Sequence, residues 1–93
     1  MMDLRFDKRF PVDLAATIQW YERVSPEACD RLRASITDRL VSISEFPESF
    51  QLLTTGRGHR GSSISGFPWL IVFRIEKDNV RILRIVHLAS DWQ

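Results

Sequence analysis

The 93-residue chain contains little cysteine, glycine or histidine, and it has no long hydrophobic run. With Cys29 as the single cysteine, no internal disulfide can form, so we expect a reducing compartment, the cytoplasm. Two distant histidines and one cysteine lack the spacing of a zinc site, and we expect neither a metal nor a cofactor. The longest apolar run, FPWLIVF, is far shorter than the roughly 20 residues that span a bilayer. These absences predict a soluble protein without a membrane partner.

The sequence also lacks a strong charge of one sign, because its net charge is +1. Residues 1–46 carry seven basic and eight acidic side chains, whereas residues 47–93 carry six basic and four acidic ones. This asymmetry favours an anionic partner for the C-terminal half. A dedicated nucleic-acid-binding domain usually has an isoelectric point above the value of about 8.0 found here.

Apolar residues are plentiful: 44% of the chain is hydrophobic, including three Trp and six Phe. This content is sufficient for a hydrophobic core, and no repeat, low-complexity tract or linker divides the sequence. We therefore predict one domain over residues 1–93.

The N-terminal half predicts a strand and then two helices. Residues 4–10, LRFDKRF, alternate like a half-buried strand with Leu4, Phe6 and Phe10 on one side. Residues 11–24 have helical spacing, and we expect Asp13 in the first turn, where the helix dipole favours an anion. The apolar stripe of this helix comprises Leu14, Ile18 and Tyr21.

A second helix is predicted directly after the first. Ser25 is expected as its N-cap and Pro26 as its first residue, and the helix should run to about Glu45 before Pro47. So short a connection predicts that the two helices pack as a hairpin. The apolar stripe of the second helix comprises Ala28, Leu32, Ile36, Leu40 and Ile43.

The C-terminal half predicts a loop followed by three strands. Residues 47–59 have no clear period and are interpreted as a loop, and residues 60–66 as a weak strand. Residues 67–75 and 80–86 are rich in β-branched and aromatic side chains, and EKDN between them is expected to form a hairpin turn. The predicted fold class is α+β, in the order β-α-α-β-β-β, with the helical hairpin packed on one face of a mainly antiparallel sheet.

In a hairpin with an even-numbered loop, residues whose numbers sum to an odd value lie opposite each other, and this pairing predicts the two faces of the last two strands. The face predicted to meet the helices carries Trp69, Ile71, Phe73, Ile75, Val80, Ile82, Arg84 and Val86. The less covered face carries Leu70, Val72, Arg74, Arg81, Leu83, Ile85 and His87. This second face is apolar in its middle and cationic at its borders, which suits a partly open groove. His87 is thus expected in line with Arg74 and Arg81.

Five side chains are candidate ligands for a protein or nucleic-acid partner: Arg57, Arg60, Arg74, Arg81 and His87. The loop GRGHRG can bind phosphate through backbone N–H groups and guanidinium forks, or it can simply be a solvated loop. His87 can take part in proton transfer, or it can hydrogen-bond a neighbour and end the sheet. Cys29 lies near the apolar face of its helix and is predicted to be inert.

The element order and two motifs are similar to those of the RelE/ParE superfamily, the toxins of type II toxin–antitoxin systems, often labelled plasmid stabilisation proteins. The motifs are a helical hairpin, WYE…SP.A…L…I…L..I..FP, and a strand pair, FPWLIVFR…VRIL.IVH, followed by a terminal DW. The resemblance extends over residues 13–92. It implies a toxin that a cognate antitoxin holds inactive in a hetero-oligomer, with an extended or helical antitoxin segment lying across the helices and the sheet.

The resemblance leaves the target open between two branches. RelE-like members are ribosome-dependent endoribonucleases that cut mRNA without a metal, and ParE-like members inhibit DNA gyrase. In the nuclease pattern one arginine enters the third strand and another follows the strand-end histidine by two residues, whereas this sequence has Leu70 and Ala89 there. Losing one such stabilising donor typically lowers a rate by about 10²–10³-fold. The resemblance therefore favours a ParE-like toxin that is not an enzyme.

Two alternatives remain at this point. One is an mRNA endoribonuclease with His87, Arg60 and Arg74 as catalytic residues and with the ribosome and mRNA as partners. The other is a non-toxic family member that acts only as an interaction partner.

Overall fold

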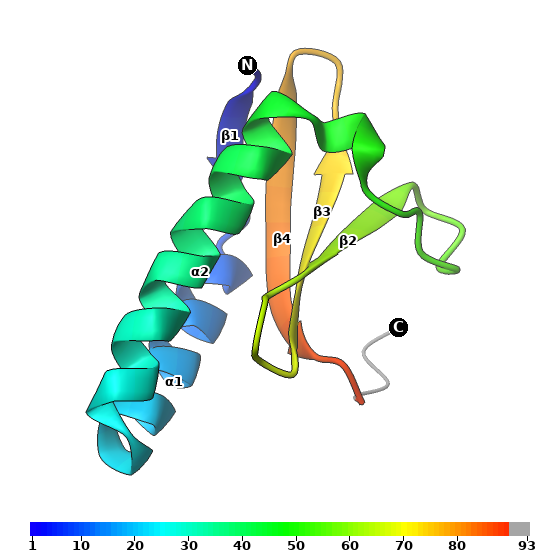
Figure 1. The fold of residues 1–93 in the computed structure, drawn as a ribbon. Helices are drawn as coiled ribbons and strands as arrows, with labels where there is room; N and C mark the ends of the chain where they lie inside the picture. The colour runs from blue at the N-terminus through cyan, green and yellow to red at the C-terminus, as the bar shows by residue number, and fades with distance from the viewer. Residues whose placement is uncertain (90–93) are drawn as a thin grey trace.

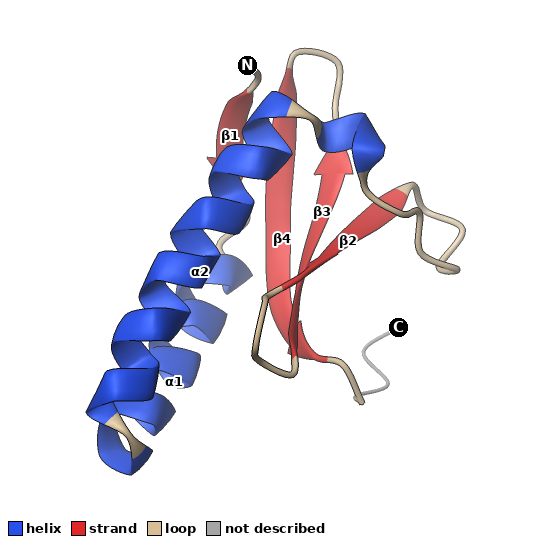
Figure 2. Cartoon of the chain, viewed as in Figure 1, coloured by secondary structure: helices blue, strands red, loops and turns tan. Residues whose placement is uncertain are grey.

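The computed structural model describes residues 1–89 and contains two helices, one 3-10 turn and four strands. In chain order these are β1 (Asp3–Phe6), α1 (Arg9–Val24), α2 (Pro26–Glu45), η1 (Pro47–Ser49), β2 (His59–Ser63), β3 (Trp69–Ile75) and β4 (Asn79–His87). Figure 1 shows the two helices side by side against the sheet, and Figure 2 shows the separation of helices from strands. The predicted α+β class and the order β-α-α-β-β-β are confirmed. The terminal residues Asp91 and Trp92 lie outside the described residues.

The chain leaves β1 and enters α1 earlier than the sequence predicts. The expected strand over residues 4–10 ends at Phe6, and α1 already begins at Arg9. The cause is Asp7, whose Oδ1 accepts a hydrogen bond from the Arg9 N–H at 2.9 Å and whose carbonyl accepts one from the Phe10 N–H at 3.0 Å. Phe10 is thereby buried as a helical residue. Local capping by Asp7 therefore outweighs the alternating apolar pattern.

The second helix, α2, agrees with the prediction in its boundaries and in most of its buried stripe. Ser25 is the N-cap of α2, its Oγ accepts a hydrogen bond from the Ala28 N–H at 3.2 Å, and Pro26 is the first helical residue. Leu32 and Ile43 are fully buried. Three side chains of α1 are half-buried and pack against the same core, namely Leu14, Ile18 and Tyr21.

The sheet is mixed, with the strand order β1-β4-β3-β2. β1 pairs with β4 in parallel, and the two remaining pairs are antiparallel. The outer edge of β2 is partly covered by the preceding loop, since the Leu53 N–H donates to the His59 carbonyl at 2.8 Å and the Gly61 N–H to the Gln51 carbonyl at 3.2 Å. β4 extends beyond β1, and there α1 lies against it.

Two apolar clusters occupy the two faces of the sheet. The larger one joins the helices to the face that we call the covered face, and its fully buried members include Leu32, Ile43, Ile71, Phe73, Val80 and Ile82. The smaller one lies on the opposite side, which we call the open face, and consists of Val72, Leu83 and Val86 with Leu53 and Leu70 packed against them. The open face therefore has its own small core, to which the loop before β2 contributes Leu53.

A β-bulge in β4 changes the predicted faces of its last residues. Pairs near the turn, such as Arg74 with Arg81, follow the predicted register, but beyond Val72 the register shifts by one residue. Leu83 is the extra residue, so that Leu83 and Arg84 both lie opposite Val72. The prediction is wrong beyond this point: Arg84 and Val86 belong to the open face, and Ile85 and His87 to the covered face.

Candidate functional site

A row of basic side chains crosses the open face of the sheet. The register places Arg5 of β1 beside Arg81 of β4, Arg81 beside Arg74 of β3, and Arg74 beside His59 of β2. Each of the four strands thus contributes one residue to the row. The sequence predicted the neighbourhood of Arg74 and Arg81 correctly, but it did not predict Arg5 as part of it.

A hollow of about 270 Å³ lies beside this row. Its walls carry the four arginines Arg9, Arg57, Arg74 and Arg84 together with Asp7 and His59, and its floor includes Val72 and Leu83. The structure therefore brings Arg57 and Arg74 together, as predicted, and adds Arg9 and Arg84. With four guanidinium groups and one carboxylate on its walls, the hollow is suited to an anionic ligand.

Acidic residues of the chain already bind several of these arginines. Glu76, in the turn between β3 and β4, accepts hydrogen bonds from Arg74 Nη2 at 2.8 Å and from Arg81 Nε at 3.2 Å. The bond to Arg74, followed by the charge of Arg81, holds the pKa of Glu76 below its ordinary value. Asp7 binds Arg9 at 3.1 Å, and the hydrogen bonds from Arg9 lower the pKa of Asp7 in the same way. Within residues 1–89, no ion pair involves Arg57.

His59 is the buried titratable group of the hollow, with only 8% of its surface exposed. Burial lowers the pKa of the imidazole, and the positive charges of Arg74, Arg57 and Arg9 lower it further. Burial and the surrounding cations therefore both favour the neutral form of the side chain.

Asp13 connects α1 to the bulged part of β4. Its carboxylate accepts hydrogen bonds from Arg84 Nε at 2.7 Å, from Arg84 Nη2 at 3.1 Å and from the Ile85 N–H at 3.1 Å. The bond to Asp13 raises the pKa of Arg84. The expectation that Asp13 stabilises the first helical turn is wrong, because α1 begins at Arg9 and has no acidic residue in that turn. Asp13 instead satisfies an edge N–H of β4 that β1 does not reach.

His87 lies away from the cationic row, contrary to the prediction. It pairs with Trp69 on the covered face, and the two rings meet edge to face with centroids 5.2 Å apart. Its Nδ1 accepts a hydrogen bond from the Ala89 N–H at 3.0 Å. The Leu83 bulge is the physical reason, since one extra residue turns the end of the strand to the other face.

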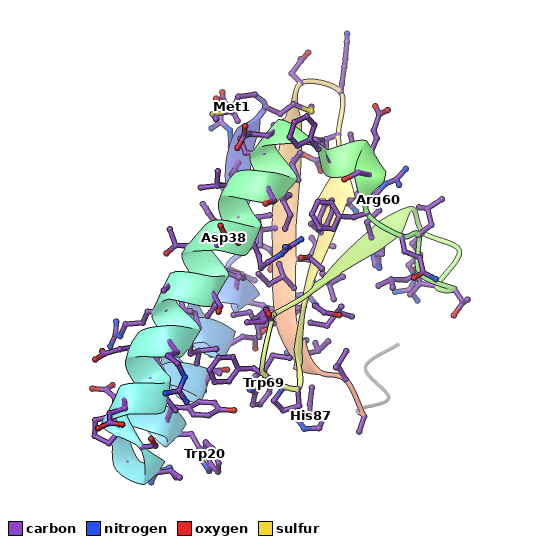
Figure 3. All side chains as sticks on the ribbon, viewed as in Figure 1. Met1, Trp20, Asp38, Arg60, Trp69 and His87 are labelled. Atoms are coloured by element: carbon purple, nitrogen blue, oxygen red, sulfur yellow. The ribbon has the colours of Figure 1, made fainter. Side chains whose placement is uncertain are left out.

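Arg60 lies on the covered face as well, opposite Phe73. Its Nη1 donates to the carbonyls of Phe50 at 2.7 Å and Glu48 at 3.3 Å, so the guanidinium holds η1 and the residue that follows it. Figure 3 shows Arg60 and His87 at opposite ends of the sheet. The five predicted ligand residues are therefore divided between two faces.

His87 lines a second, larger depression of about 490 Å³ between α1 and the ends of β3 and β4. Its wall is aromatic: Trp69 Nε1 donates to the Tyr21 hydroxyl at 3.1 Å, and Trp20 contacts the Tyr21 ring edge to face. Trp20 and Val12 of α1 are 47% and 69% exposed. An aromatic depression with an exposed tryptophan at its rim is typical of a protein-binding surface.

Sequence reasoning missed Arg5, Arg9 and Arg84 as members of the open-face site. Arg5 alternates with the apolar residues Leu4 and Phe6, and this signal was sufficient to find it. Arg84 could not be found by alternation, because its face depends on the bulge. In the part of the chain that the structure describes, no three metal-ligating side chains lie together and no helix is long and apolar enough to cross a membrane.

Several solved structures have a similar fold. One from the chromosomal ParDE system of P. aeruginosa matches with a TM-score of 0.81 and 21% identity, covering 94% of this chain and 96% of that one. The DinJ–YafQ complex of E. coli matches with a TM-score of 0.60 and 14% identity over both whole chains. The conserved hypothetical protein HP0894 of Helicobacter pylori matches with a TM-score of 0.57 and 15% identity, covering 97% and 98%. No curated protein sequence matches the chain.

These similarities show that the chain shares the α+β fold of those structures. The particular family follows from the sequence, because residues 4–92 match the model of the ParE toxin of type II toxin–antitoxin systems, parDE. The match includes nearly the whole chain, and the chain belongs to the ParE toxin family. The predicted membership in the RelE/ParE superfamily is thereby confirmed.

Proposed function

We propose that this ParE-family toxin acts in the cytoplasm by binding and inhibiting DNA gyrase, and that it is not a nuclease. The observation that carries the proposal is the separation of the three residues that a nuclease was expected to use. His87 contacts Trp69, Arg60 holds loop carbonyls, and Arg74 is paired with Glu76 on the other face. Metal-free cleavage of RNA needs an acid–base pair and cations around one phosphate, and these three side chains do not converge.

Two further positions support the same proposal. Leu70 and Ala89 occupy the places of the two arginines in the nuclease pattern, and Leu70 packs against the small apolar cluster of the open face. An alkyl side chain cannot stabilise the charge that develops on a phosphorane.

A cognate antitoxin is the second part of the proposal. The aromatic depression at Trp20, Tyr21 and Trp69 and the exposed Val12 offer apolar area for an antitoxin segment. The similar structure from P. aeruginosa is described as a ParDE toxin–antitoxin system. We therefore expect a hetero-oligomer of this chain with a small protein encoded beside it.

An mRNA endoribonuclease remains the second candidate, for one specific reason. His59 is a buried imidazole beside Arg57 and Arg74 in the open-face hollow, and a neutral imidazole surrounded by guanidinium groups is able to accept a proton from a ribose hydroxyl. In this case the catalytic histidine is His59 instead of His87.

The test combines expression with two target assays. Induced expression should arrest growth without the neighbouring gene and permit growth with it. The purified toxin should then block supercoiling by gyrase and leave mRNA intact in a translating extract. His87→Ala and His59→Ala should both retain supercoiling inhibition. Cleavage of mRNA by the wild-type toxin that is lost in His59→Ala would establish the nuclease. Expression without any growth arrest would establish a non-toxic family member.

A further inference from the structure

The hollow on the open face has a composition that points to one kind of ligand group. Its walls are cationic and its floor is aliphatic, formed by Val72 and Leu83. A ligand that satisfies both must carry a short hydrocarbon stem that ends in an anion. The side chain of glutamate has this chemistry, whereas a phosphate group has no stem to place on an apolar floor.

The ion pairs within the chain show that its guanidinium groups bind carboxylates. Glu76 binds Arg74 and Arg81, Asp7 binds Arg9, and Asp13 binds Arg84, all at 3.2 Å or less. Arg57 is the wall residue that has no ion pair within the described part of the chain. A carboxylate entering beside Arg57 and Arg74 would therefore complete a pattern that the neighbouring arginines already follow.

The open face is poorly suited to single-stranded nucleic acid. Proteins that bind single strands usually stack bases on exposed aromatic rings. The open-face residues of the four described strands include no Phe, Tyr or Trp, because these rings lie on the covered face or in the helices and loops. Three acidic side chains also stand among the arginines of the site, which lowers the positive potential available to a phosphate backbone.

We propose that a glutamate side chain of the antitoxin inserts into this hollow, with its methylene groups on Val72 and Leu83 and its carboxylate between Arg57 and Arg74. This inference rests on the antitoxin of the proposed function and adds the chemistry by which one of its residues is recognised. The antitoxin segment that carries this glutamate lies across the open face, next to the half-buried side chains of Leu53 and Leu70.

Charge reversal at Arg57 tests the proposal without disturbing the fold, because Arg57 is an exposed loop residue. The full-length toxin is titrated with the full-length antitoxin encoded beside it, at low and at high salt. Arg57→Glu should weaken binding by about tenfold or more at low salt, because like charges that face each other in an interface are strongly unfavourable. The difference should shrink at high salt. Arg31→Glu makes the same charge change at an exposed residue of α2 and should alter the affinity less than about twofold.

A charge swap identifies the partner residue. Each glutamate of the antitoxin is replaced by lysine in turn, and one of these variants should bind Arg57→Glu more tightly than it binds the wild-type toxin. Equal affinities of the wild-type and Arg57→Glu toxins for the antitoxin would overturn the proposal. A scan in which no glutamate-to-lysine substitution of the antitoxin restores binding to Arg57→Glu would overturn it as well.

A nucleic-acid ligand is the competing outcome. A short fluorescein-labelled single-stranded RNA should bind the toxin weakly, and Arg57→Glu should change that binding much less than it changes antitoxin binding. RNA binding that Arg57→Glu abolishes, with antitoxin binding unchanged, would assign the hollow to nucleic acid. The gyrase assay separates the two proposals, because supercoiling inhibition is measured in the absence of antitoxin.

Discussion

Both faces of the sheet carry aliphatic strand residues, but only the covered face is sealed by the helices. On the covered face, Ile71 and Phe73 are sealed by the helices and by the segment after η1. On the open face, Val72 and Leu83 form a small aliphatic patch bordered by arginines. The difference shows that in a domain of this size one layer of helices can supply most of the core. The other face is then available for a partner.

The largest expected effect comes from a matched pair of neighbours on β3. Ile71 is fully buried on the covered face, and Leu70 is half-buried on the open face. Ile71→Ala should lower the free energy of unfolding by about 2–5 kcal/mol, the range for deletions in a packed core. Leu70→Ala should cost about 1 kcal/mol, a typical value for a single substitution. Urea denaturation measures both, and equal losses would mean that the two faces are equally important for stability.

A smaller effect is expected where the two faces are joined. The carboxylate of Asp13, on α1, binds Arg84 and the Ile85 N–H at the bulge. Asp13→Asn should lower the free energy of unfolding by about 1–3 kcal/mol, because charged hydrogen bonds at a partly buried site are lost. Asp38→Asn at an exposed residue of α2 serves as the control and should remain within about 0.5 kcal/mol of wild type. A loss no larger than that of the control would show that the contacts of Asp13 with Arg84 and the Ile85 N–H do not contribute to stability.

The smallest effect should appear as a pH dependence caused by His59. Its pKa in the folded state is below the ordinary value of 6.5, so the unfolded chain takes up a proton first as the pH falls. Stability should therefore be complete above pH 6.5 and should decrease as the pH falls from there toward the folded-state pKa. The carboxyl groups of Asp7 and Glu76, with lowered pKa values, lose their contribution only at lower pH, below their ordinary values of 3.8 and 4.5.

Denaturation midpoints between pH 6.5 and 4.5 measure this slope. In His59→Gln the slope should be reduced, because that variant has no imidazole to protonate at the site. An unchanged slope would indicate that other groups of the molecule cause it.

Much of the fold was predictable because the signals were local. Ser25 and Pro26 mark a helix start by capping chemistry alone, and the buried stripe of α2 follows from its period. The site was less predictable because it depends on contacts between distant residues. Asp13 and Arg84 are 71 residues apart, and no local pattern connects them. The strand end before Asp7 was missed because a short-range cap outweighed an alternating sequence.

The bulge at Leu83 lets β4 carry two phases of alternation, one on each side of the bulge. Deleting one residue there would return the last part of the strand to strict alternation. Arg84 and Val86 would stay on the open face, and Ile85 and His87 would stay on the covered face, because the deletion removes the extra residue itself. A strand of the same length without the bulge would instead bring His87 to the open face, so the single extra residue at Leu83 keeps the imidazole away from the arginines.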